Sequence, residues 1–292
     1  MKPCSFEYFA PSSVQEAIGL LEQHSERQAK ILAGGQSLVP LMNFRLARPE
    51  VLIDINGLKE LEYIREEGDE IVIGALTRER DVEVSELVRQ KCPFLAEAIS
   101  HIGHVAIRNR GTVGGSVVHA DPSAEIPIAL CALGGTIKAI GPTGEATFTP
   151  EEFFVTYLTT ALEPTQVLTE ITVPALPRGT SWAFKELCRR CGDFAIVAVA
   201  AILFMDGKGT CTEARIALGG VAPTPVRAGQ AEALLAGQRL SDGLIAEVAK
   251  AAIEATDAES DYHASAEYRK ELTRVLVQRA VTEAMKKAQE GN

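Results

Sequence analysis

The first half of the chain alternates helical periodicity with short apolar runs. Ser13 and Glu16 form a capping-box pattern, and the apolar residues that follow recur at helical spacing, namely Val14, Ala17, Ile18 and Leu21. Other apolar stretches are only four or five residues long, at 30–33, 51–55 and 71–74. Runs of this length predict strands, so the pattern indicates a mixed α and β region.

The middle of the chain continues this mixture. The predicted elements are a helical region at 77–101 that is broken at Cys92-Pro93, a short helix at 123–133, a hairpin at 136–149 and a strand at 167–174. Pro93 suits the first turn of a new helix, and Gly134-Gly135 ends the short helix.

A change of pattern marks a second unit. The run Pro174–Gly179 holds two prolines and a glycine, which indicate a linker. Beyond it, three strands are predicted at 182–187, 194–205 and 212–218, and then only helices from Ala228 onward. This order predicts an α+β fold with a small antiparallel sheet backed by helices. We therefore expect domains at 1–176 and 177–292.

Composition narrows the class of protein. The 292 residues are 46% apolar and 23% charged, with 29 basic and 39 acidic residues and a net charge of −10. This balance disfavours electrostatic binding to nucleic acid or to an anionic membrane surface. The longest apolar run, Ala195–Met205, is too short to span a membrane, and the N-terminus lacks a signal-peptide core. We expect a cytoplasmic protein whose six cysteines are reduced thiols.

Two glycine-rich loops carry the candidate chemistry. One packs Gly111, Gly114 and Gly115 together with hydroxyl residues at 112 and 116, and the other runs from Gly34 to Leu38. Glycines let a ligand approach the backbone closely, and N–H groups freed in such turns suit a phosphate. Two such loops could hold opposite sides of one diphosphate. The alternative is an ordinary glycine-rich turn between core strands.

The two loops together resemble the paired signature of one family. The segments Ala33–Leu38 (AGGQSL) and Ile107–Ser116 (IRNRGTVGGS) are similar to those of the FAD-binding medium subunit of the molybdenum hydroxylases. This group includes carbon monoxide dehydrogenase, xanthine dehydrogenase and aromatic-ring hydroxylases. The resemblance extends over His119–Pro122 with Glu125, Leu168–Ile171, Phe184-Lys185 and Gly192–Ala195.

The resemblance implies a fold and a set of site residues. The fold is a vanillyl-alcohol-oxidase-type FAD-binding domain with two α/β subdomains, about 1–57 and 58–176, followed by a small C-terminal domain with a three-stranded antiparallel sheet and helices. The implied FAD contacts are Ala33, Gly34, Gly35, Gln36, Ser37, Leu38, Ile102, Thr112, Val113, Gly114, Gly115, Ser116, Asp121, Glu125, Leu168, Lys185 and Phe194.

Within this set, the two loops would hold the pyrophosphate, and Ile102 and Phe194 would sandwich the isoalloxazine ring. A flat, largely apolar ring favours such a platform. Two alternatives stay open. Phe194 opens the most apolar strand and could be ordinary core, and Lys185 could be a solvated strand residue.

The implied activity is electron transfer in a heterotrimeric oxidoreductase. A large molybdenum-cofactor subunit would oxidise the substrate, a small iron–sulfur subunit would pass electrons on, and FAD in this chain would deliver them to an acceptor such as NAD or oxygen. Gln36 is no nucleophile, so we expect non-covalent FAD. The alternatives are a free-standing flavin oxidoreductase and a nucleotide-binding module without redox work.

Other chemistry-bearing residues point to no further site. Cys188 and Cys191 have metal or redox spacing, but no second close pair completes a zinc site. His101 and His104 likewise lack further ligands, so we expect no metal and no catalytic side chain. The two arginines at 108 and 110 lie in a stretch expected to be extended, hence on one face. They could approach the diphosphate, dock a partner or pair with local acids.

Overall fold

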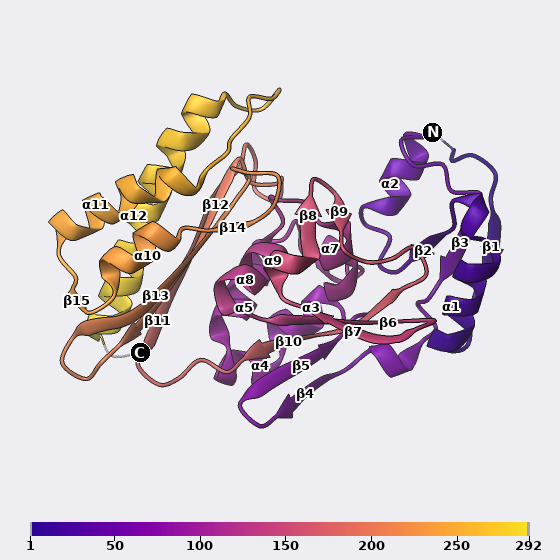
Figure 1. The fold of residues 1–292 in the computed structure, drawn as a ribbon, viewed down its shortest axis with the longest axis horizontal. Coiled ribbons are helices and arrows are strands. Elements are labelled where there is room, and N and C mark those ends of the chain that lie inside the picture. Colours follow the sequence, from indigo (N-terminus) through magenta and orange to yellow (C-terminus); the bar gives the residue numbers. More distant parts are fainter. Residues whose placement is uncertain (1, 291–292) are drawn as a thin grey trace.

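The computed structural model describes residues 2–290, which form three regions along the long axis of the molecule (Figure 1). The N-terminal region is a parallel sheet of three strands in the order β1-β3-β2. Its elements are β1 (Glu7–Phe9), α1 (Val14–Gln23), a 3₁₀ turn at Ser25–Arg27, β2 (Lys30–Leu32), α2 (Leu38–Asn43), β3 (Val51–Asp54) and a 3₁₀ turn at Lys59–Leu61.

Helix α1 illustrates how the local pattern determines this region. The four apolar residues predicted to share a face are all buried, against a core that includes Val51 and Ile53. The Ser13 hydroxyl accepts a hydrogen bond from the Glu16 N–H at 3.2 Å. The Glu16 carboxylate, however, accepts from the N–H of Ser12 at 2.7 Å. The capping box is therefore only half formed, and its second half is shifted by one residue.

The middle region is built on an antiparallel sheet of five strands in the order β4-β5-β10-β6-β7. The strands are β4 (Ile64–Glu67), β5 (Glu70–Gly74), β6 (Thr136–Gly141), β7 (Gly144–Phe148) and β10 (Val167–Pro174). The helices are α3 (Glu79–Val84), α4 (Glu86–Lys91), α5 (Pro93–Ser100), α6 (Val105–Arg108), α7 (Val113–His119), α8 (Glu125–Leu133) and α9 (Pro150–Phe153). A hairpin of β8 (Phe154–Thr156) and β9 (Thr159–Thr160) follows α9.

Helix α8 joins the middle region to the C-terminal region. Every residue of α8 is buried. Its side chains share one hydrophobic cluster with residues of the middle sheet, such as Ile137, and of the C-terminal sheet, such as Ala200. Such an apolar helix is typical of one enclosed on all sides. The middle and C-terminal regions therefore share a core.

The C-terminal region is an antiparallel sheet with helices on its outer face (Figure 1). The predicted three strands are present as β11 (Thr180–Leu187), β12 (Val197–Met205) and β13 (Thr210–Gly219). The sheet is larger than expected, because two short strands, β14 (Val226–Arg227) and β15 (Gln238–Arg239), pair with β13. The helices are α10 (Gly229–Leu235), α11 (Asp242–Ala251), a 3₁₀ turn at Ala252–Ala255 and α12 (Ala266–Glu290).

Two local expectations were wrong. The strand expected from Phe194 starts only at Val197, because residues 192–196 form a loop that turns around Gly192 with φ of 88°. The stretch with the two arginines is not extended, since Val105–Arg108 forms the helical turn α6. Arg108 is buried and Arg110 is exposed, so they share no face.

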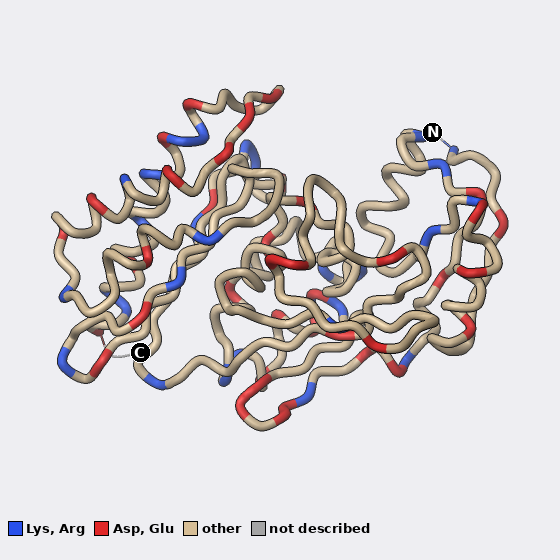
Figure 2. Tube along the Cα trace, viewed as in Figure 1, with Lys and Arg blue, Asp and Glu red and all other residues tan. Residues whose placement is uncertain are grey.

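Charged residues are spread over the chain. Lys and Arg are interspersed with Asp and Glu along the whole tube and are not gathered on one element (Figure 2). Within residues 2–290, no helix combines the length and the apolar character that crossing a bilayer requires.

Candidate functional site

The two glycine loops lie against each other. We call 33–38 the first loop and 111–116 the second loop. A Cβ atom on Gly34 would collide with the carbonyl oxygen of Arg110 and lie 2.9 Å from the Cα of Gly111. A Cβ on Gly115 would lie 3.9 Å from the Cβ of Ala33. Segments more than 70 residues apart therefore meet, and at Gly34 their approach leaves no room for a side chain.

Asn56 and Arg78 tie the loops together. The Asn56 side-chain amide donates to the carbonyl oxygen of Ala33 at 2.7 Å. The Arg78 guanidinium donates to the Asn56 side-chain oxygen at 2.9 Å and to the carbonyl oxygen of Arg110 at 2.6 Å. Neither residue was predicted from the sequence, because a single Asn or Arg near a strand end gives no local signal.

The first loop presents hydrogen-bond donors. Within the described residues, no protein acceptor takes the backbone N–H groups of Gln36, Ser37 and Leu38. Gly35 has φ of 73°, the left-handed conformation that turns the chain here. The Gln36 side chain donates to the carbonyl oxygen of Gly34 at 3.1 Å. Neighbouring free N–H groups form a surface that suits a phosphate oxygen.

In the second loop, in contrast, backbone N–H groups are already hydrogen-bonded to other parts of the protein. The N–H groups of Val113 and Gly114 donate to the carbonyl oxygens of Thr77 and Ala75, at 3.1 and 2.9 Å. The Gly115 N–H donates to the Thr112 hydroxyl oxygen, which caps α7, at 3.1 Å. The expectation of free N–H donors in this loop was therefore wrong for Val113, Gly114 and Gly115. Its contribution is shape, together with the hydroxyl groups of Thr112 and Ser116.

A buried carboxyl group supports the second loop from below. The Glu79 side chain packs so closely on Gly111 that a Cβ there would overlap the carboxyl group. One of its oxygens is buried without a hydrogen-bond partner among the described residues. Burial raises the pKa of Glu79 to about 8, although Arg108 lowers it in part. Glu79 is thus predominantly protonated at neutral pH.

Arg108 does not point to the diphosphate loops. Its guanidinium lies 2.7 Å from the Glu83 carboxylate and donates to the carbonyl oxygen of Ile102 at 2.7 Å. Of the three roles left open by the sequence, pairing with a local acid is the one that the structure gives this residue. The ion pair holds the turn that carries Ile102, one of the expected ring contacts.

Glu125, another predicted contact, is the first residue of α8 and is only 5% exposed. Burial, together with the nearby carboxyl groups of Glu186 and Glu79, raises its pKa to about 8. A protonated carboxyl group can donate a hydrogen bond to a ligand, which a carboxylate cannot. Across the domain interface, His101 lies 3.3 Å from the Glu186 carboxylate.

The remaining predicted contacts are not all brought together. Ile102 is half-buried between α5 and α6, and Asp121 accepts a hydrogen bond from the Ser123 N–H at 2.8 Å. Leu168 is buried in β10. Lys185 lies on the face of β11 that packs against α12, where its ammonium group is 2.5 Å from the Glu283 carboxylate. The structure does not bring Lys185 to the two loops.

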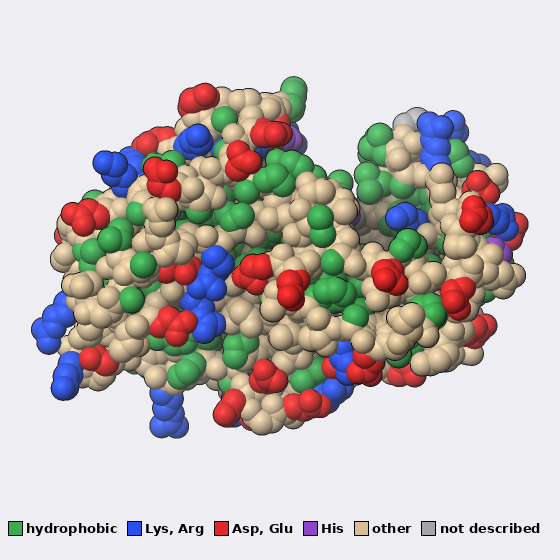
Figure 3. Space-filling model, in the orientation of Figure 1, with side chains coloured by type: hydrophobic (Ala, Val, Ile, Leu, Met, Phe, Trp, Pro, Cys, Tyr) green, Lys and Arg blue, Asp and Glu red, His purple; other side chains and the backbone are tan. Residues whose placement is uncertain are grey.

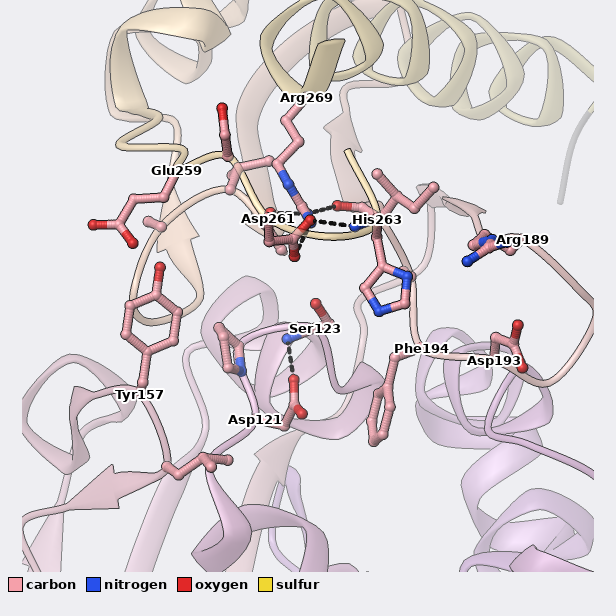
Figure 4. A pocket seen from close by; sticks show the side chains of 18 of the residues that line it. Asp121, Ser123, Tyr157, Arg189, Asp193, Phe194, Glu259, Asp261, His263 and Arg269 are labelled. Carbon is pink, nitrogen blue, oxygen red and sulfur yellow. Dashed lines mark hydrogen bonds and ion pairs between the residues drawn. The ribbon is translucent and has the colours of Figure 1, made fainter. Parts of the chain in front are cut away.

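Phe194 is not part of the core. Its side chain is 57% exposed in the loop before β12, which excludes the core alternative. It lines a cavity of about 730 Å³ between the middle and C-terminal regions, together with Asp121 and Tyr157 (Figure 4). A separate hollow lies between the lobe that carries α2 and the middle of the molecule (Figure 3).

Among residues 2–290, no group of three His, Cys, Asp or Glu side chains is arranged to hold a metal ion. Cys188 is half-buried and Cys191 is exposed.

The chain matches two families of known domains. Residues 4–176 match the FAD binding domain in molybdopterin dehydrogenase, and residues 182–284 match the CO dehydrogenase flavoprotein C-terminal domain.

Named relatives match along nearly the whole chain. The alpha subunit of the 6-hydroxypseudooxynicotine dehydrogenase complex of Paenarthrobacter nicotinovorans is 42% identical over 99% of this chain and 97% of its own length. The carbon monoxide dehydrogenase medium chain of Hydrogenophaga pseudoflava is 40% identical over 97% of this chain and 98% of its own length.

Solved structures share the fold. Carbon monoxide dehydrogenase from Hydrogenophaga pseudoflava lacking the Mo-pyranopterin moiety matches with a TM-score of 0.94 and 42% identity, over 97% of this chain and 98% of that chain. Quinoline 2-oxidoreductase from Pseudomonas putida 86 matches with a TM-score of 0.93 and 36% identity, over 99% of both chains. The predicted α+β fold, an FAD-binding domain followed by a C-terminal domain with an antiparallel sheet, is confirmed. The chain belongs to the FAD-binding medium subunits of the molybdenum hydroxylase family of oxidoreductases.

Proposed function

We propose that this chain is the electron-transfer subunit of a molybdenum hydroxylase complex. It holds FAD non-covalently, receives electrons from the iron–sulfur clusters of a small partner subunit and passes them to an external acceptor such as NAD or oxygen. A large partner subunit with the molybdenum cofactor oxidises the substrate. When bound, FAD accepts electrons one at a time and releases two together.

The contact between the two glycine loops carries the proposal. The two loops touch, and the N–H groups of residues 36–38 in the first loop have no acceptor among the described residues. Such donors suit a diphosphate in a chain whose net charge is −10, because they attract phosphate through local dipoles. We assign the diphosphate to Ala33–Leu38 and Thr112–Ser116 and the flavin ring to Ile102 and Phe194. Asp121 and Glu125 are further proposed FAD contacts.

Two of the FAD contacts that the family resemblance implies, Leu168 and Lys185, lie less favourably in the structure. Leu168 is buried and could reach the cofactor only through its backbone. Lys185 would have to leave its ion pair with Glu283. We retain both as proposed contacts because they match the family motifs. A loss of FAD affinity in Lys185→Ala that exceeds the loss in Glu283→Ala would support the role of Lys185.

Non-covalent binding follows from the residue at position 36. Gln36 has no nucleophilic atom, and its amide is hydrogen-bonded to its own loop. Mild acid should therefore release all the flavin from the purified protein. Flavin that stays attached to the polypeptide would contradict this point.

The partners and the location follow from the same proposal. One relative is named as a subunit of a dehydrogenase complex, and another is named as a medium chain. These names support separate large and small partner chains. We place the complex in the cytoplasm. Within the chain, we propose an FAD-binding domain at 1–176, with subdomains at about 1–57 and 58–176, and a C-terminal domain at 177–292.

Two measurements test the proposed function. The visible spectrum of the purified chain should show flavin bands, and purification from the native host should bring two further chains with molybdenum and iron. A colourless protein that ignores added FAD would rule out the proposal. Flavin without partner chains, together with turnover of an organic donor by the isolated chain, would favour a free-standing flavin oxidoreductase.

A further inference from the structure

The cavity beside Phe194 is lined by several separate segments. They include the β8–β9 hairpin with Tyr157 and Leu158, the loop 189–196 before β12, and the segment 259–263 before α12, together with residues 121–123 and 220–222 (Figure 4). Its volume of about 730 Å³ is within the range of small-molecule sites. It lies between two regions of the fold, where ligand sites commonly form.

Two aromatic rings line the cavity. Phe194 is 57% exposed and is assigned to the flavin ring, whereas Tyr157 is 44% exposed and is available to a second ligand. Figure 4 shows both side chains entering the cavity from different segments. Aromatic faces attract flat ring systems, and they attract cations through their negative quadrupole.

The charges that line the cavity are mainly negative. Four carboxyl groups and two guanidinium groups line it, namely Asp121, Asp193, Glu259 and Asp261 against Arg189 and Arg269. Arg269 is already used, since it donates to Asp261 at 2.7 Å and to the carbonyl oxygens of Ile196 and Gly220 at 2.5 and 2.7 Å. Arg189 is thus the lining cation that has no ion pair among the described residues.

This lining opposes anionic ligands. A pyridine dinucleotide carries a diphosphate, which would meet several carboxylates and one available arginine. A neutral or cationic ring system meets no such repulsion and can stack on Tyr157.

We propose that this cavity binds the electron acceptor, and that the acceptor is a small planar aromatic oxidant without negative charge, in place of the NAD or oxygen named above. The inference rests on the proposed function, because Phe194 is the residue assigned to the flavin ring. In the transfer, the reduced flavin loses two electrons and two protons. The oxidant gains the same two electrons with the protons that its reduced form needs, and any remainder goes to water.

The test compares two fluorescent probes of similar size on the FAD-loaded complex. N-methylacridinium is a planar cation and acridine-9-carboxylate is a planar anion. We expect the cation to bind at least about tenfold more tightly at low salt, with the difference shrinking as salt screens the carboxylates. NAD should bind no better than the anionic probe. Reduced flavin should be reoxidised faster by N-methylphenazinium than by NAD.

Variants locate the binding site. Tyr157→Ala should weaken N-methylacridinium binding by about five- to tenfold. Asp193→Asn and Glu259→Gln should each weaken it by about two- to fivefold. Matched controls are Tyr268→Ala, an exposed ring on α12, and Glu22→Gln, an exposed acid on α1, neither of which lines the cavity. Flavin absorbance and thermal unfolding of each variant show that the fold and FAD are retained.

Three outcomes would overturn the inference. They are equal binding of both probes, displacement of FAD by the cation, and binding that is unchanged in Tyr157→Ala. Failure of the proposed function looks different, since it would appear as a protein without flavin or without partner chains. If the flavin-loaded complex does not bind N-methylacridinium, only the proposed acceptor site is contradicted.

Discussion

The two glycine loops look alike in sequence but work differently in the structure. Both combine a glycine pair with a hydroxyl residue one or two positions further on. The first loop leaves the N–H groups of residues 36–38 free for a ligand. The second loop uses its N–H groups to fix α7 on the strand end and packs its glycines against Ala75 and Glu79. The same composition thus provides donors in one place and close packing in the other.

The largest effect is expected where the loops touch. In Gly34→Val, the new side chain would collide with the backbone of Arg110 and Gly111 and push the loops apart. Overpacking of this kind costs about 1–3 kcal/mol, so FAD affinity should fall by about 10- to 100-fold. Titration of the flavin-free protein with FAD measures this loss. Gly57→Ala is the matched control, because a Cβ there meets nothing within 4 Å.

A substitution in the second loop should lower the stability of the protein. A Cβ on Gly114 would lie 2.7 Å from the Cβ of Ala75, inside the core. Gly114→Ala should therefore lower the free energy of unfolding by about 1–3 kcal/mol in the flavin-free protein. Chemical denaturation measures the change. Gly19→Ala, in open space on α1, should be neutral or slightly stabilising. Equal stability of Gly114→Ala and wild type would show that the second loop is not a packing element.

Glu79, which packs under the second loop, should make the stability of the protein depend on pH. Its pKa is about 8 in the folded protein and near 4.5 in the unfolded chain, so between these values the folded state binds more protons. Stability should therefore fall as pH rises through this window. Glu79→Gln should flatten the profile between about pH 5 and pH 8, while Glu125 maintains a residual slope of the same sign. A profile that is unchanged in the variant would refute this assignment.

The smallest effect concerns the cap of α7. Thr112→Val removes the oxygen that accepts the Gly115 N–H and should cost about 1 kcal/mol of stability. Thr112→Ser keeps the oxygen and should restore most of that loss. If Thr112→Val reduces FAD affinity much more than stability, the hydroxyl contacts the ligand directly, and the two loops are more alike than their hydrogen bonds indicate.

The local pattern of the sequence determined much of this protein. Helical periodicity, short apolar runs and the proline-rich linker predicted the α+β organisation, because these features act between neighbouring residues. The glycine pairs with their hydroxyl neighbours marked the candidate diphosphate loops for the same reason.

Only the tertiary structure decided how these parts are used. It brought residue 34 onto residue 110, joined the loops through Asn56 and Arg78, and buried Glu79. It also placed Phe194 in an exposed loop, where a strand was expected, and it paired Arg108 with Glu83. These outcomes depend on which distant segments exclude water from each other, and no spacing along the chain records that.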